Sequence, residues 1–230
     1  MVLLALAGTL LFLQLGRWQW HRAEYKRALA AAFVSDAGRI TTLGSRPLTE
    51  LPRYARVQVE GLYDPAHQFL LDNMTRDGRA GYEVLTPLTL ADGRALLVNR
   101  GWLPLPAEGR GRLPDVSFVA LPEVTATGKI DELPVTGLAM GRAPPDVGAN
   151  WPKRTSFPDS VQLGAALGRP VEARQLLLDA DQPQGYRRDW KPGSAGFGPE
   201  RHLAYAIQWW GLAALTMVLL IVLNLKARQP

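Results

Sequence analysis

The sequence contains no cysteine among its 230 residues. This absence excludes disulfide bonds, thiolate zinc sites, iron–sulfur clusters and covalently attached c-type haem. It leaves the redox compartment open, because a chain without cysteine can fold under oxidising or reducing conditions. Histidine is scarce as well, with only His21, His67 and His202, which argues against a histidine-rich catalytic metal site.

Dense runs of basic residues are also absent, although the net charge is +5. No RNA- or DNA-binding motif is visible, so we interpret the basic balance as compatibility with a membrane surface and expect no nucleic-acid partner. Catalytic signatures are missing too: we find no acid–base dyad, no G-x-S-x-G and no H-E-x-x-H. The sequence therefore predicts that the protein is not an enzyme.

What the sequence does contain is a long apolar run at each end. Residues 203–225 carry no charge, and at the usual helical rise this run is about 34 Å long, enough to span a bilayer. Glu200 favours the positive end of the helix dipole, and Lys226 follows the run. We therefore predict a transmembrane helix over residues 201–225 and a short tail over residues 226–230.

The N-terminal apolar run is shorter. Residues 2–16 are uncharged; Trp18 and Trp20 can extend them into the interface, and Arg17 can reach toward the headgroups. The alternative is a cleaved signal peptide, but its basic n-region is missing and the first small-residue cleavage site lies too far beyond the apolar core. We predict a retained transmembrane helix over residues 1–20, and the missing basic flank fits a natural start upstream.

Two spans would put both termini on one side of the membrane and a soluble domain, residues 21–200, on the other. Lys226 argues for a cytoplasmic tail, whereas Arg17 and Arg22 would place the domain in the cytoplasm. Because long domains follow the charge rule poorly, the residues alone leave the orientation open.

The middle of the chain has mostly β character. Residues 55–61 alternate, with Val57 and Val59 on one face, and five further stretches are strand candidates; turn signals such as Asp77-Gly78 and Asp92-Gly93 lie between them. The clearest hairpin joins the third and fourth of these strands. The predicted strands are residues 55–61, 67–73, 82–90, 94–102, 124–130 and 173–180.

Two helices are predicted beside these strands. One continues the first span from roughly Arg22 to Phe33; the other covers residues 159–167, with Asp159 or Ser160 as its cap and Gly168 as its stop. The Pro- and Gly-rich stretches 103–122 and 132–158 are predicted to be long loops. We therefore expect an α+β membrane protein: two transmembrane helices flanking a mostly antiparallel β domain, barrel-like or an open sheet, with one or two short helices.

His202 stands at the start of the second apolar helix. It is either a wetted interfacial histidine or a ligand, since neutral imidazole binds haem iron and transition metals. Tyr205 and Trp209 follow on the same helical face, a pattern that suits a flat hydrophobic cofactor and plain helix packing equally well. The residues alone leave this choice open.

Gln14 and Gln208 are polar residues inside the two spans. Their separations from His21 and His202 match in an antiparallel pair, and an unsatisfied amide is costly in lipid. We therefore predict that the two glutamines face each other or a shared ligand. The same geometry would bring His21 to His202 at one membrane boundary, where both could serve as axial ligands.

Asn99, Arg100, Gly101 and Trp102 end a predicted strand. A glycine there indicates a close backbone approach or a bulge, and an arginine beside a tryptophan allows a cation–π contact. A functional surface and a buried arginine that holds the strand end are equally compatible with this pattern.

Four stretches match a known family in the right order over most of the chain. They are LGRWQWHRAEYK (15–26), GYEVLTPLTLADGRALLVNRGWLP (81–104), the helix and strand at 159–167 and 173–180, and RHLAYAIQWWGLA (201–213). Together they resemble the Surfeit locus protein 1 family, assembly factors for haem–copper cytochrome c oxidase. The V-N-R-G-W-aliphatic-P signature and the final R-H-L-x-Y-A-x-Q-W-aromatic motif are the specific parts of this resemblance.

The resemblance implies a domain on the periplasmic or intermembrane-space side of a bacterial or mitochondrial inner membrane. It implies a role in binding haem a and inserting it into the large oxidase subunit, the principal partner, with haem a synthase as a further one. The family's histidine corresponds to His202, the implied ligand of the haem iron. His21 departs from the family pattern, so ligation by two histidines is our own hypothesis.

A site at the membrane boundary suits the apolar macrocycle, the hydrocarbon tail and the propionates of haem a. His202 would ligate the iron, Tyr205, Gln208 and Trp209 would line the ring or tail, and Arg22 would meet a propionate. The alternative function is a docking scaffold that stabilises oxidase subunits without binding haem. In that case the block from Asn99 to Trp102 would dock the partner, and His202 would only pack.

Overall fold

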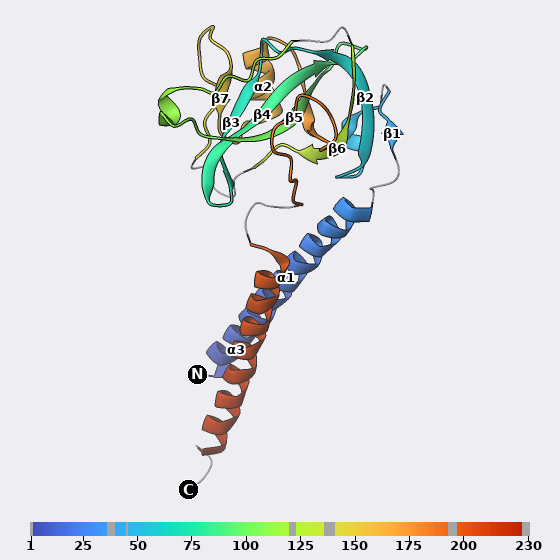
Figure 1. The fold of residues 1–230 in the computed structure, drawn as a ribbon. Coiled ribbons are helices and arrows are strands. Elements are labelled where there is room, and N and C mark those ends of the chain that lie inside the picture. Colours follow the sequence, from blue (N-terminus) through green and yellow to red (C-terminus); the bar gives the residue numbers. More distant parts are fainter. Residues whose placement is uncertain are drawn as a thin grey trace. The chain divides into compact units, whose positions relative to one another are not determined.

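The computed structural model describes residues 2–35, 40–44, 46–119, 123–135, 141–192 and 197–226. The chain forms two compact units, one made of the terminal segments up to Val34 and from Lys191 onward, the other of Ser35–Trp190. Figure 1 shows a pair of long helices in the first unit and a β-rich body in the second. Apart from Lys226, the predicted tail lies outside the described residues.

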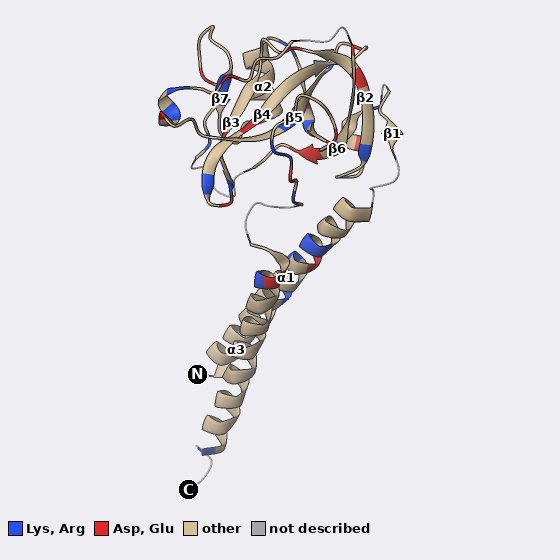
Figure 2. Cartoon of the chain, viewed as in Figure 1, with Lys and Arg blue, Asp and Glu red and all other residues tan. Residues whose placement is uncertain are grey.

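Two long helices make up the terminal unit: α1 (Val2–Ser35) and α3 (Pro199–Lys226). Both are long and apolar enough to cross a membrane, by length and composition. In Figure 2 the charged residues of α1 gather in its C-terminal half and those of α3 at its ends. Because α1 is continuous, the helix predicted from Arg22 to Phe33 is the extension of the first apolar run.

The second unit is built on an eight-stranded sheet with the order β1-β2-β6-β8-β5-β4-β3-β7. An additional pairing between β2 and β4 closes β2, β6, β8, β5 and β4 into a five-stranded barrel. Among the described strands, the pairs β1–β2, β3–β7 and β5–β8 are parallel and the others antiparallel. The strands are β1 (Thr41–Thr42), β2 (Arg56–Tyr63), β3 (Phe69–Arg76), β4 (Arg79–Thr89), β5 (Ala95–Pro104), β6 (Val124–Glu132), β7 (Lys153–Thr155) and β8 (Val171–Leu178).

The expected fold class is confirmed, with a closed barrel in place of an open sheet. Alternation along the strands fills the barrel: Val57 and Val59 of β2 join Leu96 and Val98 of β5 in one buried cluster, none of them more than 3 % exposed. Side chains two apart on a strand share a face, so each strand contributes a row to the interior.

Turn chemistry sets the register of the hairpins. Asp77 and Gly78, between β3 and β4, both have positive φ (48° and 73°), as a two-residue turn of this type requires. Gly93 has φ 82° in the turn from β4 to β5, which confirms the hairpin predicted through Asp92-Gly93.

One short helix, α2 (Ser160–Leu167), packs Leu163 against an apolar cluster of the sheet. The Asp159 side chain accepts a hydrogen bond from the backbone N–H of Gln162, and the Gln162 side chain accepts one from Asp159. Gly168, at φ 77°, ends the helix. Of the two predicted caps, Asp159 is therefore the correct one.

Short elements escape the sequence prediction. β1 and β7 have two and three residues, too few for a period-two pattern to stand out. β7 lies within the stretch predicted as a loop at 132–158, and the 3₁₀ turn η2 (Gly109–Gly111) lies within 103–122. A second such turn, η1 (Leu48–Glu50), precedes β2.

Candidate functional site

The two terminal helices pack through small residues. On α1 the buried positions recur every seven residues, and Gly16 is one of them. A Cβ atom on Gly16 would overlap the indole ring of Trp210, so only glycine lets the helices approach this closely. The buried residues are Thr9, Gly16 and Ala23 on α1 and His202, Ala206 and Ala213 on α3.

The adjacent tryptophans of α3 pack against aromatic residues of α1. The ring centroids of Phe12 and Trp209 are 5.7 Å apart, and those of Trp20 and Trp210 are 5.9 Å apart. Trp209, predicted to line a cofactor, therefore has a packing partner within the chain, which is the alternative that the sequence left open.

His202 faces α1 and is only 8 % exposed. Its Nδ1 lies 2.7 Å from Oε1 of Gln19. An amide oxygen can only accept a hydrogen bond, so Nδ1 carries the proton and, in the neutral ring, Nε2 keeps its lone pair. Nε2 makes no hydrogen bond within the described residues.

An aromatic pair flanks this histidine on the outside. The ring of Phe197 stands edge-on to His202 with centroids 6.2 Å apart, and its centroid lies 6.1 Å from that of Tyr205. Both aromatic side chains are partly open to the surroundings, at 48 % and 40 % exposure. The predicted site residue Tyr205 therefore lies in the neighbourhood of His202, with Phe197 next to both rings.

Two cations approach His202 from the first helix. Gln19, Arg22 and Lys26 recur at helical spacing and therefore share one face of α1. The charges of Arg22 and Lys26 act electrostatically on the His202 ring. The structure thus brings together three of the predicted site residues, His202, Tyr205 and Arg22.

His21 is not part of this group. Its side chain is 60 % exposed, and its Nδ1 lies 3.5 Å from Glu24. Two residues beyond Gln19 on a helix, it points to nearly the opposite side, about 200° around the axis. The prediction that helix pairing brings His21 to His202 is therefore wrong, and nothing in the geometry supports ligation by both.

The predicted direct contact of Gln14 with Gln208 is wrong as well, whereas the other form of that prediction, a ligand shared by the two, stays a prediction. Both side chains are exposed, and neither takes part in a hydrogen bond within the described part of the chain. The amide at the helix interface is that of Gln19, which the sequence reasoning missed because Gln19 lies outside the uncharged run 2–16. The signal that could have found it is the Trp-Gln-Trp block of the first resembling stretch.

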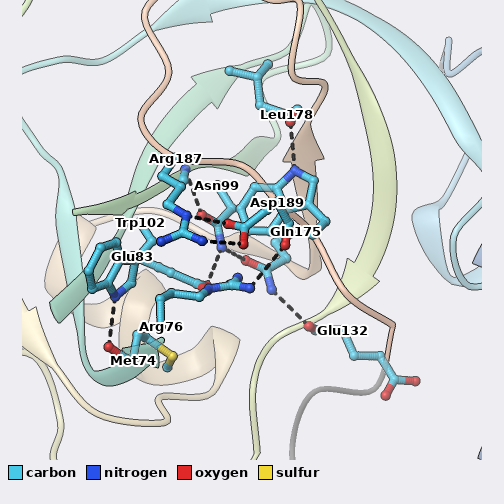
Figure 3. A network of polar contacts seen from close by, with 12 residues as sticks. Met74, Arg76, Glu83, Asn99, Trp102, Glu132, Gln175, Leu178, Arg187 and Asp189 are labelled. Atoms are coloured by element: carbon cyan, nitrogen blue, oxygen red, sulfur yellow. Dashed lines mark hydrogen bonds and ion pairs between the residues drawn. The ribbon is translucent and has the colours of Figure 1, made fainter. Parts of the chain in front are cut away.

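The second predicted group, the block from Asn99 to Trp102, lies at the end of β5. Asn99 is fully buried, and its Nδ2 donates to Glu83 Oε2 (2.8 Å) and to Gln175 Oε1 (3.0 Å). Its Oδ1 accepts from the backbone N–H of Gly101 at 3.2 Å. Figure 3 shows this network, which ties β5 to its neighbours β4 and β8.

Arg100 is only 3 % exposed. Its guanidinium donates to the Gln184 carbonyl (2.7 Å) and to Gln68 Oε1 (2.9 Å), and it lies 4.1 Å from the ring centroid of Phe118 and 5.2 Å from that of Tyr186. Burial lowers the pKa of Arg100 below its ordinary value. This arginine holds the strand end from inside.

Gly101 and Trp102 hold a later segment of the chain against β5. Gly101 has φ 111°, and a Cβ atom there would collide with the Arg187 carbonyl. The Trp102 backbone N–H donates to that carbonyl at 2.8 Å, and its indole Nε1 donates to Met74 O at 2.8 Å. With all four residues buried, the block does not present a surface to a partner, and the predicted docking role lacks support.

Two further observations concern sites for a metal or a cofactor elsewhere in the described residues. These residues contain no group of three or more His, Asp or Glu side chains placed to hold a metal ion. A cavity of about 160 Å³ in the β-rich unit, lined by Gln68 and Trp151 among others, is well below the roughly 300–1,000 Å³ of typical ligand pockets.

Comparison with known proteins gives a consistent result. The model of the SURF1 family matches residues 6–214. Surfeit locus protein 1 of Xenopus tropicalis is 27 % identical over 230 residues, covering 89 % of this chain and 69 % of that protein. A SURF1-like protein of Monosiga brevicollis is 26 % identical, covering 92 % and 83 %. Surfeit locus protein 1 of Takifugu rubripes is 26 % identical, covering 88 % of each chain.

Proposed function

Because the chain belongs to the SURF1 family, we propose that it is a membrane-anchored assembly factor for haem–copper cytochrome c oxidase. Its task is to take up haem a transiently and assist its insertion into the large oxidase subunit, its main partner. We propose haem a synthase as a second partner, because it would supply the haem a that this protein takes up. We propose no enzymatic activity, since the sequence offers no catalytic constellation.

The observation that carries this proposal is the hydrogen bonding of the two ring nitrogens of His202. Its Nδ1 is engaged by Gln19, while Nε2 has no hydrogen-bond partner within the described residues. A neutral imidazole with one nitrogen hydrogen-bonded and the other bare is the form that binds iron. This donor sits in the first turn of a helix that can cross a membrane.

The surroundings fit the other parts of haem a. The exposed rings of Phe197 and Tyr205 suit an apolar macrocycle, and the cation of Arg22 suits a propionate. Exposed apolar residues of α1 and α3 would meet lipid beside the hydrocarbon tail. Trp209 and Gln208 are not proposed as ligand contacts, because Trp209 stacks on Phe12 and Gln208 is exposed on another face.

The His202 ring has little room around it. Only 8 % of His202 is exposed, and the Phe197 ring stands edge-on beside the imidazole. We therefore propose that Phe197 moves aside when a porphyrin binds at Nε2. A single ligand with a movable neighbour favours moderate affinity over permanent retention. Moderate affinity is what a protein that releases its cargo requires.

For the location we propose a two-pass protein of the bacterial or mitochondrial inner membrane. α1 and α3 are the spans, both termini lie on one side, and the β-rich unit lies on the periplasmic or intermembrane-space side. Support comes from the length and composition of the two helices and from the family resemblance.

An absorption spectrum of the purified protein tests the haem proposal. Protein made in cells that synthesise haem a is expected to show a Soret band, and His202→Ala is expected to remove it and to impair oxidase maturation. His67→Ala is the matched control, because His67 pairs with Asp64 in the β-rich unit. A wild-type sample without a Soret band, together with normal oxidase maturation in His202→Ala, would leave the docking scaffold as the better account.

A further inference from the structure

The hydrogen bond between Gln19 and His202 carries an inference of its own. We propose that Gln19 is a positioning residue, whose amide oxygen holds the proton of His202 on Nδ1 and thereby leaves Nε2 as the nitrogen that binds the iron. The inference rests on the proposed function for its ligand, but the state of the ring can be tested without haem.

The geometry supports an orienting bond. At 2.7 Å from Oε1 to Nδ1, the contact is short for a hydrogen bond between neutral groups. It joins side chains that lie 183 positions apart in the sequence, on two different helices. It therefore fixes both the rotation of the ring and the protonated nitrogen only while α1 and α3 are paired.

Burial makes this bond consequential. His202 is 8 % exposed, so water offers Nδ1 little alternative partner, and loss of the acceptor would leave a buried donor unpaired. In water a neutral histidine prefers to carry its proton on Nε2, the position that blocks ligation there. An acceptor at Nδ1 reverses this preference, which is how outer partners of metal-binding histidines act.

Gln19 itself has no direct access to the ligand in this role. It acts through His202, and its effect is expected on the orientation and tautomer of the ring. Removal of such an outer partner typically lowers metal affinity by about 10- to 100-fold. We therefore expect Gln19→Leu to weaken haemin binding by this factor without unfolding the helix pair.

The experiment combines two measurements on the full-length protein in detergent. Nitrogen-15 NMR of the histidine side chains in the haem-free protein reports which ring nitrogen is protonated. The signals of His202 are assigned as those that disappear from the spectrum of His202→Ala. Titration with haemin, followed at the Soret band, gives the affinity. The variants are Gln19→Leu, Gln19→Glu, which retains an acceptor, and Gln14→Leu, which removes an exposed amide from the same helix.

Wild type, Gln19→Glu and Gln14→Leu are expected to protonate Nδ1 and to bind haemin with similar affinity. Gln19→Leu is expected to shift the proton toward Nε2 and to bind about 10- to 100-fold more weakly. Rescue by Gln19→Glu excludes a general loss of folding as the cause.

Two results would overturn the inference and leave the proposed function intact: protonation of Nε2 in the wild type, or haemin binding by Gln19→Leu as tight as that of Gln14→Leu while His202→Ala binds weakly. If His202→Ala binds haemin as tightly as wild type, both the inference and the ligation by His202 fail, and the two failures are thus distinguishable.

Discussion

At the scale of single residues, we propose that Phe197 limits access to His202. Its ring stands edge-on to the imidazole with centroids 6.2 Å apart, and the residue is 48 % exposed, which leaves it room to move aside. An edge-to-face contact between rings contributes about 0.5–1.5 kcal/mol, little enough to be displaced by an incoming macrocycle. The residue therefore limits access more than it stabilises the fold.

Phe197→Ala is expected to bind haemin faster, by up to about tenfold, because a contact of roughly 1.4 kcal/mol no longer has to be broken. Stopped-flow absorbance at the Soret band measures this rate. Trp18→Ala, which removes an exposed ring elsewhere on the helices, should leave the rate unchanged. An unchanged or slower rate in Phe197→Ala would show that this ring is not the obstacle.

Tyr63 gives the β-rich unit a predictable response to high pH. Burial raises the pKa of Tyr63 to about 12, against the partly compensating charges of Arg100 and Arg188. In the unfolded chain a tyrosine ionises near pH 10. Between these values only the unfolded chain loses the proton, so the stabilisation present below pH ~10 is lost as the pH rises toward ~12.

We expect the free energy of unfolding of the wild type to fall over this range, and to fall less in Tyr63→Phe, which keeps the ring contact with Phe118. Denaturant unfolding at several pH values from 8 to 11 measures the slope. Burial also raises the pKa values of Tyr82 and Tyr186. The free energy of unfolding of Tyr63→Phe should therefore still decrease with pH, but less steeply than that of the wild type. Equal slopes for the two proteins would contradict the assignment to Tyr63.

His202 was within reach of sequence reasoning and Gln19 was not, for a physical reason. A histidine beside a long uncharged run is conspicuous, since ionisable residues at membrane depth are rare. A glutamine between Arg17 and Arg22, near the middle of α1, looks like an ordinary solvated side chain in the sequence. Its partner lies 183 residues away, and only the packing of the two helices brings them together.

At the scale of elements, the pairing of α1 with α3 depends on Gly16. The Trp210 indole occupies the space that a Cβ atom at this position would need. Close approach of the backbones lets Trp209 and Trp210 reach aromatic partners on α1 and lets Gln19 reach His202. Small residues at helix contacts serve this purpose in membranes.

Gly16→Leu is expected to weaken the helix pair by about 1–3 kcal/mol, the usual cost of overpacking a close contact. Unfolding of the detergent-solubilised protein by SDS, followed by tryptophan fluorescence, measures the change. Gly8→Leu is the matched control on the same helix, because a Cβ atom there meets no atom within 4 Å. If both variants unfold at the same SDS fraction as wild type, the packing of Trp210 on Gly16 is not important for stability.

The strands with strong patterns were predictable, and the closure of the barrel was not. β2 to β6 and β8 each run over eight or more residues, which is long enough for their apolar residues to stand out in the sequence. Closure depends on the pairing of Leu62 and Tyr63 with the end of β4, and this contact leaves no local mark in the sequence. The same holds for β7, whose three residues pair in parallel with β3.

At the scale of the whole molecule, the two conspicuous motifs have different tasks. The block from Asn99 to Trp102 holds the segment around Arg187 against β5 and is buried throughout. His202 lies in the helical unit, and its Nε2 makes no hydrogen bond within the part of the chain that the structure describes. Both motifs look equally specific in the sequence. Structural requirements, such as a buried hydrogen-bond network, restrict the choice of residues as strongly as ligand binding does. Both are buried, so the difference lies in hydrogen bonding: the side chains of the block bond to other parts of the chain, whereas Nε2 of His202 has no partner within the described residues.

The proposed topology makes the sides of the two units measurable. The chain has no cysteine, so a single introduced cysteine is a unique label. Val147 is 99 % exposed in the β-rich unit, and Lys226 is the last residue of α3. Substitutions at exposed positions like these usually change stability by no more than about 0.5 kcal/mol.

In cells expressing the protein in a bacterial inner membrane, a membrane-impermeant maleimide added outside spheroplasts is expected to label Val147→Cys. Lys226→Cys should react only after permeabilisation, since two spans put the C-terminal end of α3 opposite the domain. The reverse pattern would place the β-rich unit in the cytoplasm. It would contradict the proposed location of this unit on the periplasmic side. Labelling of both positions from outside would mean that α1 and α3 do not both cross the membrane, and Gln19 would then no longer be positioned beside His202 by a pair of spans.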